Sequence, residues 1–358
     1  MKDALLLNIV LSLLLVILIG WLLYVGRTIL LPIFVAIISV YLMVSATEAL
    51  RRLPFVGTLP SVFLQIVVLA GFTAVVFGIG VVFSATIREI SVVSGNYEAN
   101  LDRLIESLAL RLDLDSYELW AEIEAATLGQ IDLQRLVLAV LGGFTSFGAT
   151  IFLVVVYAAF LLGEREMFVR KTAAAFPETG RAEAILEVVA HINEQVRSYI
   201  TIKTLINIIL GMMSFTVLWS LGADFALFWA LLIALLNYIP YVGSYIAVAF
   251  PVLFSLAQFG DFAKTALLAA LLICVQMFVG NYLEPRMIGR QLNLSPFVVL
   301  VSLSVWAALW GIPGAILAVP LTSILAIILS SFSATRPVAL LLSERIAVPK
   351  QETVSTRV

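Results

Sequence analysis

Residues 225–243 read FALFWALLIALLNYIPYVG, and this stretch decides how the chain is arranged in a membrane. As a helix, the apolar piece from Phe225 to Asn237 would reach only about 20 Å, short of a hydrocarbon core about 30 Å thick. After a polar, proline-containing break, the apolar sequence resumes and continues from Val242 to Phe259. We therefore expect the two pieces to form the two arms of a hairpin.

A second break of the same kind follows later in the chain. Apolar residues 297–309 lead into WGIPGA at 310–315, and apolar residues 316–331 follow. Proline lacks an N–H, so Pro240 and Pro313 free backbone carbonyls that membrane proteins keep inside protein or beside a watery cavity. Paired broken helices in corresponding halves of a transporter point to its binding site. The pattern predicts two opposed hairpins in an inverted repeat; the alternative is a tight turn between two short, complete spans at each break.

The composition excludes a water-soluble globule. Of 358 residues, 62% are hydrophobic and 12% are charged, whereas soluble domains carry about 25% charged residues. A net charge of -2 gives no basic footprint for nucleic acid, and the single cysteine, Cys274, excludes a disulfide framework. We predict an all-α polytopic membrane protein with about six full transmembrane helices besides the hairpins, at about 4–24, 29–46, 61–84, 136–162, 205–221 and 262–283.

The charged residues gather in two stretches, 85–135 and 164–203. Because Lys and Arg are held on the cytoplasmic side during insertion, their distribution places both termini in the cytoplasm. The predicted organisation is transmembrane helices 1–3 over 1–84, an extracytoplasmic helical subdomain over 85–135, a fourth transmembrane helix over 136–163, a cytoplasmic amphipathic segment over 164–203, a transport core over 204–331 and a cytoplasmic tail over 332–358.

Motifs for catalysis and for cofactor binding are missing from the sequence. It contains no Walker A loop, no dinucleotide fingerprint, no HExxH string and no GxSxG elbow. His191 lies near Glu187 and Glu194, but a solvated helix face explains these glutamates better than a metal pair does. We expect no enzyme activity, no cofactor and no metal, so any transport is passive or driven by a gradient.

Polar residues inside apolar sequence are the candidate site. Glu284 ends an apolar helix that also carries Gln276 and Asn281, and a carboxylate near the bilayer is costly unless it is paired or functional. Proton or cation coupling is one interpretation; a structural ion pair with Arg286 or Arg290 is the other. Asn207 and Asn237 either bind a polar solute or bridge helices.

Three strings carry a family resemblance: NYIPYVGS at 237–244, NYLEPRMIG at 281–289 with LSP at 294–296, and GIPG at 311–314 with AVP at 318–320. In this order and spacing they resemble the autoinducer-2 exporter family of bacterial permeases. The resemblance implies secondary transport of a small solute, with family members assigned to autoinducer export and to sodium or lithium exchange for protons. The candidate binding or coupling residues are Asn207, Asn237, Pro240, Gly243, Gln276, Asn281, Glu284, Pro285, Pro313 and Gly314.

The sequence as a whole predicts a multi-pass protein of the bacterial inner membrane. Its expected partners are the lipid bilayer, a small-molecule or ion substrate, and further copies of itself, as a homo-oligomer such as a pentameric ring; nucleic acid is not expected. The first two spans are very apolar and are free to contact lipid or neighbouring subunits. A channel-like pore and a non-transporting scaffold that regulates envelope partners are the alternative functions.

Overall fold

The computed structural model describes residues 2–54, 56, 59–112, 133–175, 180–288 and 293–344. These residues form helices joined by turns, with no strand among them. In this part of the chain, seven helices are long and apolar enough to cross a membrane, and the shorter stretches Thr150–Glu164 and Ala226–Leu236 are also apolar. The predicted all-α polytopic membrane fold is confirmed.

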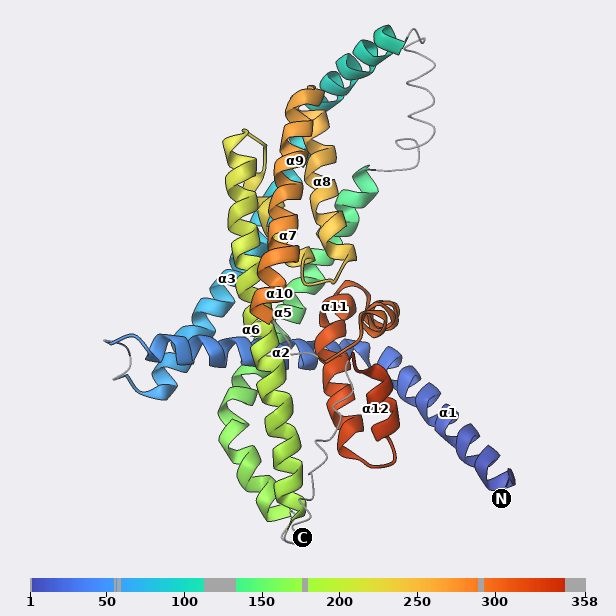
Figure 1. Cartoon of the computed structure of the whole chain (residues 1–358). Coiled ribbons are helices and arrows are strands. Elements are labelled where there is room, and N and C mark those ends of the chain that lie inside the picture. The colour runs from blue at the N-terminus through green and yellow to red at the C-terminus, as the bar shows by residue number, and fades with distance from the viewer. Residues whose placement is uncertain are drawn as a thin grey trace, which may run out of the picture.

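Figure 1 shows the helices in chain order. They are α1 (Lys2–Val25), α2 (Arg27–Arg51), α3 (Ser61–Leu112), α5 (Leu133–Ala175), α6 (Arg181–Ser220), α7 (Ala226–Leu236), α8 (Val242–Phe259), α9 (Phe262–Phe278), the π-helix η2 (Val279–Leu283), α10 (Glu284–Ile288), α11 (Pro296–Ser331) and α12 (Arg336–Leu342).

Three helices extend well beyond the predicted spans: α5, which continues to Ala175, and, by a larger margin, α3 and α6. We expected a span over 61–84 and a separate outer segment, but α3 continues unbroken to Leu112. Likewise, α6 joins the amphipathic segment and the fifth span in one helix. Neither junction contains a proline, so nothing in the local sequence stops the helix. The domain divisions remain predictions, and residues 113–132 of the predicted extracytoplasmic subdomain lie outside the described residues.

The first break reverses the direction of the chain. Trp229 of α7 and Phe254 of α8 have ring centroids 5.2 Å apart, whereas residues 25 positions apart in one straight helix would be separated by about 38 Å. At the turn, Tyr241 has a φ of 60°. A side chain at Gly243 would collide with the carbonyl oxygen of Leu236, so only glycine fits where α8 leaves the turn.

The second break folds α11 back on itself. Gly311 has φ 67° and ψ -144°, which interrupts the helix. Trp306 Nε1 donates a hydrogen bond to Thr322 Oγ1 at 3.1 Å, although a straight helix would place residues 16 positions apart about 24 Å from each other. A side chain at Gly314 would collide with the carbonyl oxygen of Trp306, just as one at Gly243 would collide with that of Leu236. The chain therefore turns back at both breaks.

The two turns meet in one hydrophobic cluster. Ile239, from the turn between α7 and α8, packs with Leu303, Ala315 and Ala318 of α11. Figure 1 shows this arrangement, with the loop below α7 and α8 next to the upper end of α11. That the hairpins enter the membrane from opposite faces and form an inverted repeat remains a prediction.

The C-terminal half of α3 is hydrogen-bonded close to both ends of the α7–α8 pair. Buried Tyr97 donates its hydroxyl to Asp224 Oδ2 at 3.0 Å, in the turn between α6 and α7. Asn100 Nδ2 donates to the carbonyl of Gln258 at 2.8 Å, close to the turn between α8 and α9. Two effects raise the pKa of the Tyr97 phenol above its usual value: burial, which has the larger effect, and the hydrogen bond to Asp224.

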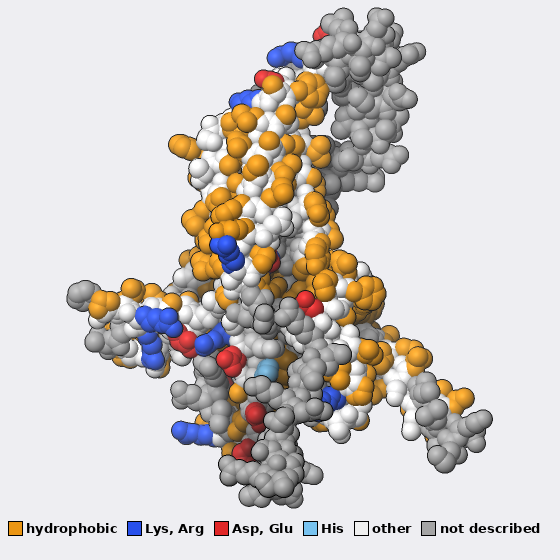
Figure 2. All heavy atoms as spheres, viewed as in Figure 1, with side chains coloured by type: hydrophobic (Ala, Val, Ile, Leu, Met, Phe, Trp, Pro, Cys, Tyr) orange, Lys and Arg blue, Asp and Glu red, His pale blue; other side chains and the backbone are white. Residues whose placement is uncertain are grey.

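The remaining helices form a frame with an apolar exterior. Helix α2 packs against α3, α5 and α6, with Ala36 and Ala158 fully buried between α2 and α5. Helix α1 projects away from the other helices (Figure 1) and leaves large side chains such as Trp21 exposed. Figure 2 shows hydrophobic side chains over most of the upper body, with charged ones at its tip and around the lower half. Such a surface is suited to lipid.

Candidate functional site

A buried ion pair joins α6 to the start of α10. Lys203 Nζ lies 2.5 Å from Glu284 Oε1, and the Lys203 side chain is only 4% exposed, whereas that of Glu284 is 27% exposed. Two charges removed from water need each other, because an unpaired charge in this environment costs several kcal/mol. The pair therefore holds the two helices together and leaves the carboxylate partly accessible.

The local backbone sets the position of Glu284. The π-helix η2 occupies Val279–Leu283, and Glu284 follows it directly. A π turn adds one residue to the helix, which rotates everything after it by about 100° around the helix axis. The π turn thus decides which face of the helix carries Glu284, and such turns occur frequently at functional sites.

A group of hydrogen-bonded amides lies about one helical turn along α6 from Lys203. Asn237 Nδ2 donates to Asn207 Oδ1 at 2.8 Å. The Asn237 Oδ1 atom accepts from Ser244 Oγ and from Gln276 Nε2, each at 3.0 Å. This amide cluster, consisting of Asn207, Asn237, Ser244 and Gln276, connects α6, the first break, α8 and α9.

Two polar atoms of the amide cluster have no hydrogen-bond partner in the described part of the chain. They are the donor Asn207 Nδ2 and the acceptor Gln276 Oε1. Asn207 is only 2% exposed, and buried polar groups in proteins are nearly always satisfied by protein, water or ligand. The amide cluster can therefore offer one donor and one acceptor to a small molecule or to water.

A further hydrogen bond connects α6 to the first break. The Thr204 and Tyr238 hydroxyl groups lie 2.7 Å apart. Thr204 is adjacent to Lys203 in α6, and Tyr238 is adjacent to Asn237. Ion pair, hydroxyl pair and amide cluster thus follow one another on α6 and make a polar strip in a mostly apolar region.

The structure gathers some of the predicted site residues and not others. Asn207, Asn237 and Gln276 bond in one cluster, and the predicted Gly243 packs closely at the break beside it. Pro240 lies in the first break and is partly buried, while Gly314 is buried at the second. Three predicted residues have exposed side chains and take no part in the cluster: Asn281, Pro285 and Pro313.

Lys203 was not among the predicted site residues. It stands at the end of the charged stretch 164–203, which the sequence assigns to the cytoplasm. Only its position four residues before Asn207, on the same helix face, pointed to an internal role. Glu284 pairs with Lys203 rather than with Arg286, whose guanidinium lies 3.7 Å from the centre of the Tyr282 ring. The other suggested partner, Arg290, lies outside the described residues. Among the described residues, no three His, Cys, Asp or Glu side chains gather as a metal site.

Comparison with known proteins finds relatives that are named as transport proteins. The chain is 38% identical over 194 residues to a protein of Borreliella burgdorferi named as a transport protein, a stretch covering 53% of this chain and 52% of the relative. It is 40% identical over 151 residues to the AI-2 transport protein TqsA of Escherichia coli K12, covering 42% of this chain and 44% of TqsA.

YhhT of Escherichia coli K12, also named as a transport protein, is 39% identical over 147 residues, which cover 41% of this chain and 42% of YhhT. The chain thus spans about half the length of the curated relatives it matches, or somewhat less. The sequence model described as AI-2E family transporter matches residues 11–334, nearly the whole length. The chain therefore belongs to the AI-2E family of transporters.

Proposed function

We propose that the protein is a secondary transporter that moves a small polar solute, or exchanges a cation for protons, by alternating access around its two hairpins. The observation that carries this proposal is the buried Lys203–Glu284 pair next to an amide cluster with an unpaired donor and acceptor. Intramembrane ionisable residues are expensive, and they mark substrate and ion pathways by default.

The mechanism follows from competition for Glu284. While Glu284 is ionised, Lys203 is its counter-ion. When a proton or a small cation binds the carboxylate, the attraction between α6 and α10 weakens, and the two helices are free to separate. Since the first break bonds to α6 and α9 through Asn237, such a movement also reaches the amide cluster. Binding of a proton or cation to Glu284 is thereby coupled to opening of the solute site.

The contact between the hairpins favours a carrier over a channel-like pore. Ile239 at the first break packs on Ala315 and Ala318 beside the second, so apolar side chains fill the space between the two turns. A carrier needs such a closed state, in which neither side has access to the site. A non-transporting scaffold, the other alternative, gives no reason for a buried ion pair beside unpaired amides.

The relatives suggest which solutes to test. TqsA is named for the transport of AI-2, and the family resemblance adds exchange of sodium or lithium for protons. We place the protein in the bacterial inner membrane, with both termini in the cytoplasm and residues 85–135 outside. Homo-oligomers, of which a pentameric ring is one form, would be built through the first two helices; the apolar side chains of α1 are widely exposed, whereas those of α2 are mostly packed against its neighbours.

Flux into proteoliposomes tests the proposal. Purified protein is given autoinducer-2, sodium or lithium under an imposed proton gradient, and saturation and counterflow are measured. Glu284→Gln keeps the shape of the side chain but removes its titration, so solute exchange should persist while proton-driven accumulation disappears. Glu187→Gln, which changes an exposed acid of α6, is the matched control.

Full proton-driven accumulation by Glu284→Gln would contradict a coupling role. Large flux without saturation or counterflow would instead indicate a pore. If no tested solute moves while the protein still retains an envelope partner through residues 85–135, the scaffold function is correct.

A further inference from the structure

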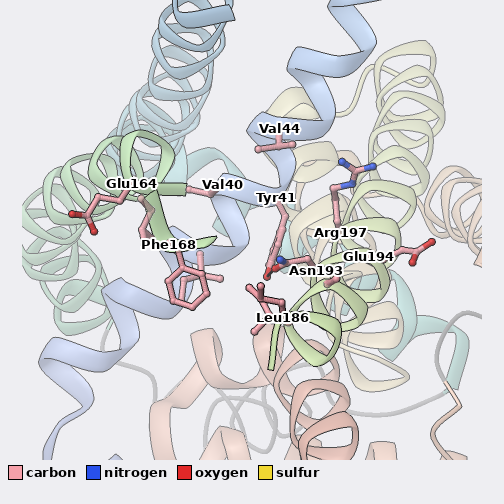
Figure 3. A pocket seen from close by; sticks show the side chains of 13 residues that line it. Val40, Tyr41, Val44, Glu164, Phe168, Leu186, Asn193, Glu194 and Arg197 are labelled. Carbon is pink, nitrogen blue, oxygen red and sulfur yellow. Dashed lines mark hydrogen bonds between the residues drawn. The ribbon is translucent and has the colours of Figure 1, made fainter. Parts of the chain in front are cut away.

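A cavity of about 860 Å³ opens between α2, α5 and α6 (Figure 3). Its volume is within the range of about 300 to 1,000 Å³ that is typical of pockets for small ligands. None of the residues that line it belongs to the ion pair or to the amide cluster. It is thus a separate site, which the transport mechanism does not use.

The walls of the cavity are mostly apolar. Val40 and Val44 come from α2, Phe168 comes from α5, and Leu186 comes from α6. Among the few polar groups inside, the Tyr41 hydroxyl and the Asn193 side-chain carbonyl oxygen are paired with each other, at 2.6 Å. The interior is therefore suited to a long apolar group and offers little to a small polar solute.

Charges of both signs lie at the edge of the cavity. Figure 3 shows Glu164 on one side and Glu194 with Arg197 on the other. Arg197 binds Glu48 at 2.6 Å through one nitrogen, and a guanidinium has further N–H groups to donate. Glu194 is exposed three residues before Arg197 on α6, so an acid and a base are neighbours on one helix face.

The cavity lies where apolar sequence gives way to charged sequence. The apolar stretch of α5 ends at Glu164, and α2 carries Glu48 and Arg51 at its end. Phe160 and Phe168 of α5 are 72% and 50% exposed, as expected of side chains that face lipid. In a membrane that α5 crosses up to Glu164, the lipid headgroups would lie at the level of this cavity.

We propose that this cavity binds one membrane phospholipid that carries an ammonium headgroup. Its acyl chains lie against the apolar walls, its phosphate accepts hydrogen bonds from Arg197, and its ammonium group lies near Glu194. Glu164 is paired with Lys171 at 3.3 Å, so the discrimination falls to Glu194, whose carboxylate would repel a lipid that carries only negative charge. A soluble lipophilic amine has the same ammonium chemistry, and the experiment distinguishes the two sources.

Native mass spectrometry of the purified protein tests the site. The protein is exchanged into detergent containing equal amounts of phosphatidylethanolamine and phosphatidylglycerol, and retained lipid is counted. Wild type should retain one phosphatidylethanolamine. Ala190→Trp fills the cavity and should lower its occupancy about tenfold, a difference of about 1.4 kcal/mol. Ala184→Trp, at an exposed position of α6 that does not line the cavity, should leave occupancy unchanged.

A second variant tests the headgroup without changing the size of the cavity. Glu194→Gln should remove the preference for phosphatidylethanolamine over phosphatidylglycerol, whereas Glu187→Gln, an exposed acid of α6 away from the cavity, should keep it. Equal retention of both lipids by wild type, or an unchanged preference in Glu194→Gln, would overturn the headgroup assignment. Full occupancy in Ala190→Trp would overturn the site. Retention of added dodecylamine, but of no phospholipid, would assign the cavity to a soluble amine.

Discussion

Lys203 and Glu284 are 81 positions apart in the sequence, yet their charged atoms lie 2.5 Å from each other. The two halves of the predicted inverted repeat are residues 203–259 and 262–331, each a helix followed by a hairpin; Lys203 stands at the start of the first half and Glu284 lies within the second. The ion pair therefore bridges the two segments that alternating access would move. A proton or cation that neutralises Glu284 would therefore act directly on the contact between these two segments.

Loss of Lys203 should be more harmful than loss of both partners. Lys203→Met leaves Glu284 without its counter-ion and should lower the stability of the protein by about 3 kcal/mol. Adding Glu284→Met should recover most of that loss, because no charge then remains buried. Thermal unfolding of the detergent-purified variants measures both effects. Equal stability of wild type and Lys203→Met would mean that the pair contributes nothing to folding.

The amide cluster should be sensitive at Asn237, which makes three of its hydrogen bonds. Asn237→Leu keeps the volume but leaves several buried polar groups unpaired, at about 1–3 kcal/mol each. We expect lower stability and a fall in solute flux of about tenfold, equivalent to 1.4 kcal/mol in barrier height. Asn281→Leu, at an exposed position, should retain both properties. Similar losses in the two variants would argue against a special role for the cluster.

Alanine at the two glycines that close the breaks should have similar effects. Gly243→Ala and Gly314→Ala each force a methyl group against a backbone carbonyl, and overpacking of this kind costs about 1–3 kcal/mol. Gly78→Ala in α3 meets open space and should cost nothing, since alanine favours helix. Unfolding temperatures and flux measured on the three variants check this. Unchanged unfolding temperature and flux in both Gly243→Ala and Gly314→Ala would show that the turns accept a methyl group at little cost.

The high pKa of Tyr97 predicts a change in stability in alkaline solution. Because burial and Asp224 raise this pKa, the folded state holds the phenolic proton more tightly than the unfolded state does. The stabilisation is therefore complete below the ordinary tyrosine pKa of about 10 and is lost as the pH rises further. The stability difference between wild type and Tyr97→Phe should shrink above that pH. A difference that does not change with pH would contradict the assignment.

Cysteine labelling tests the predicted topology. In a Cys274→Ser background, a membrane-impermeant maleimide applied to intact cells should label a cysteine placed at Ser116 and should not label one at Ser343. This follows from the distribution of Lys and Arg, which puts residues 85–135 outside and the tail inside. Labelling of both sites after permeabilisation shows that each is reactive. The reverse pattern in intact cells would invert the orientation.

The helical class and the places of the breaks could be read from the sequence, because hydrocarbon imposes strong local rules. A short apolar run before Pro240 and glycine with proline at 311–313 are visible without any neighbour, and chain reversal is found at both places. The lengths of α3 and α6 could not be read in this way. Helices continue past the membrane wherever the sequence permits, and the change from apolar to charged residues marks a change of solvent rather than of backbone.

The candidate site was predictable only in part, because it depends on contacts between distant segments. Polar residues in apolar sequence, such as Asn207, Asn237 and Gln276, were recognisable by composition. Lys203 was not, because a lysine beside a charged stretch looks like a cytoplasmic residue until its partner 81 positions away is known. Asn281 had the right chemistry, but the π turn at 279–283 alters which side chains face inward, and periodicity cannot show such a turn.

The unbroken course of α3 has a mechanical consequence. Its 52 residues make a rod about 78 Å long, one part in the predicted membrane region and the other bound to the first hairpin through Tyr97 and Asn100. A straight helix moves as a rigid body. A force applied near its C-terminal end would therefore be passed on to the turn at Asp224 and to the end of α8 at Gln258. A force that the cell envelope exerts on the predicted outer segment would then change the rate at which the first hairpin moves.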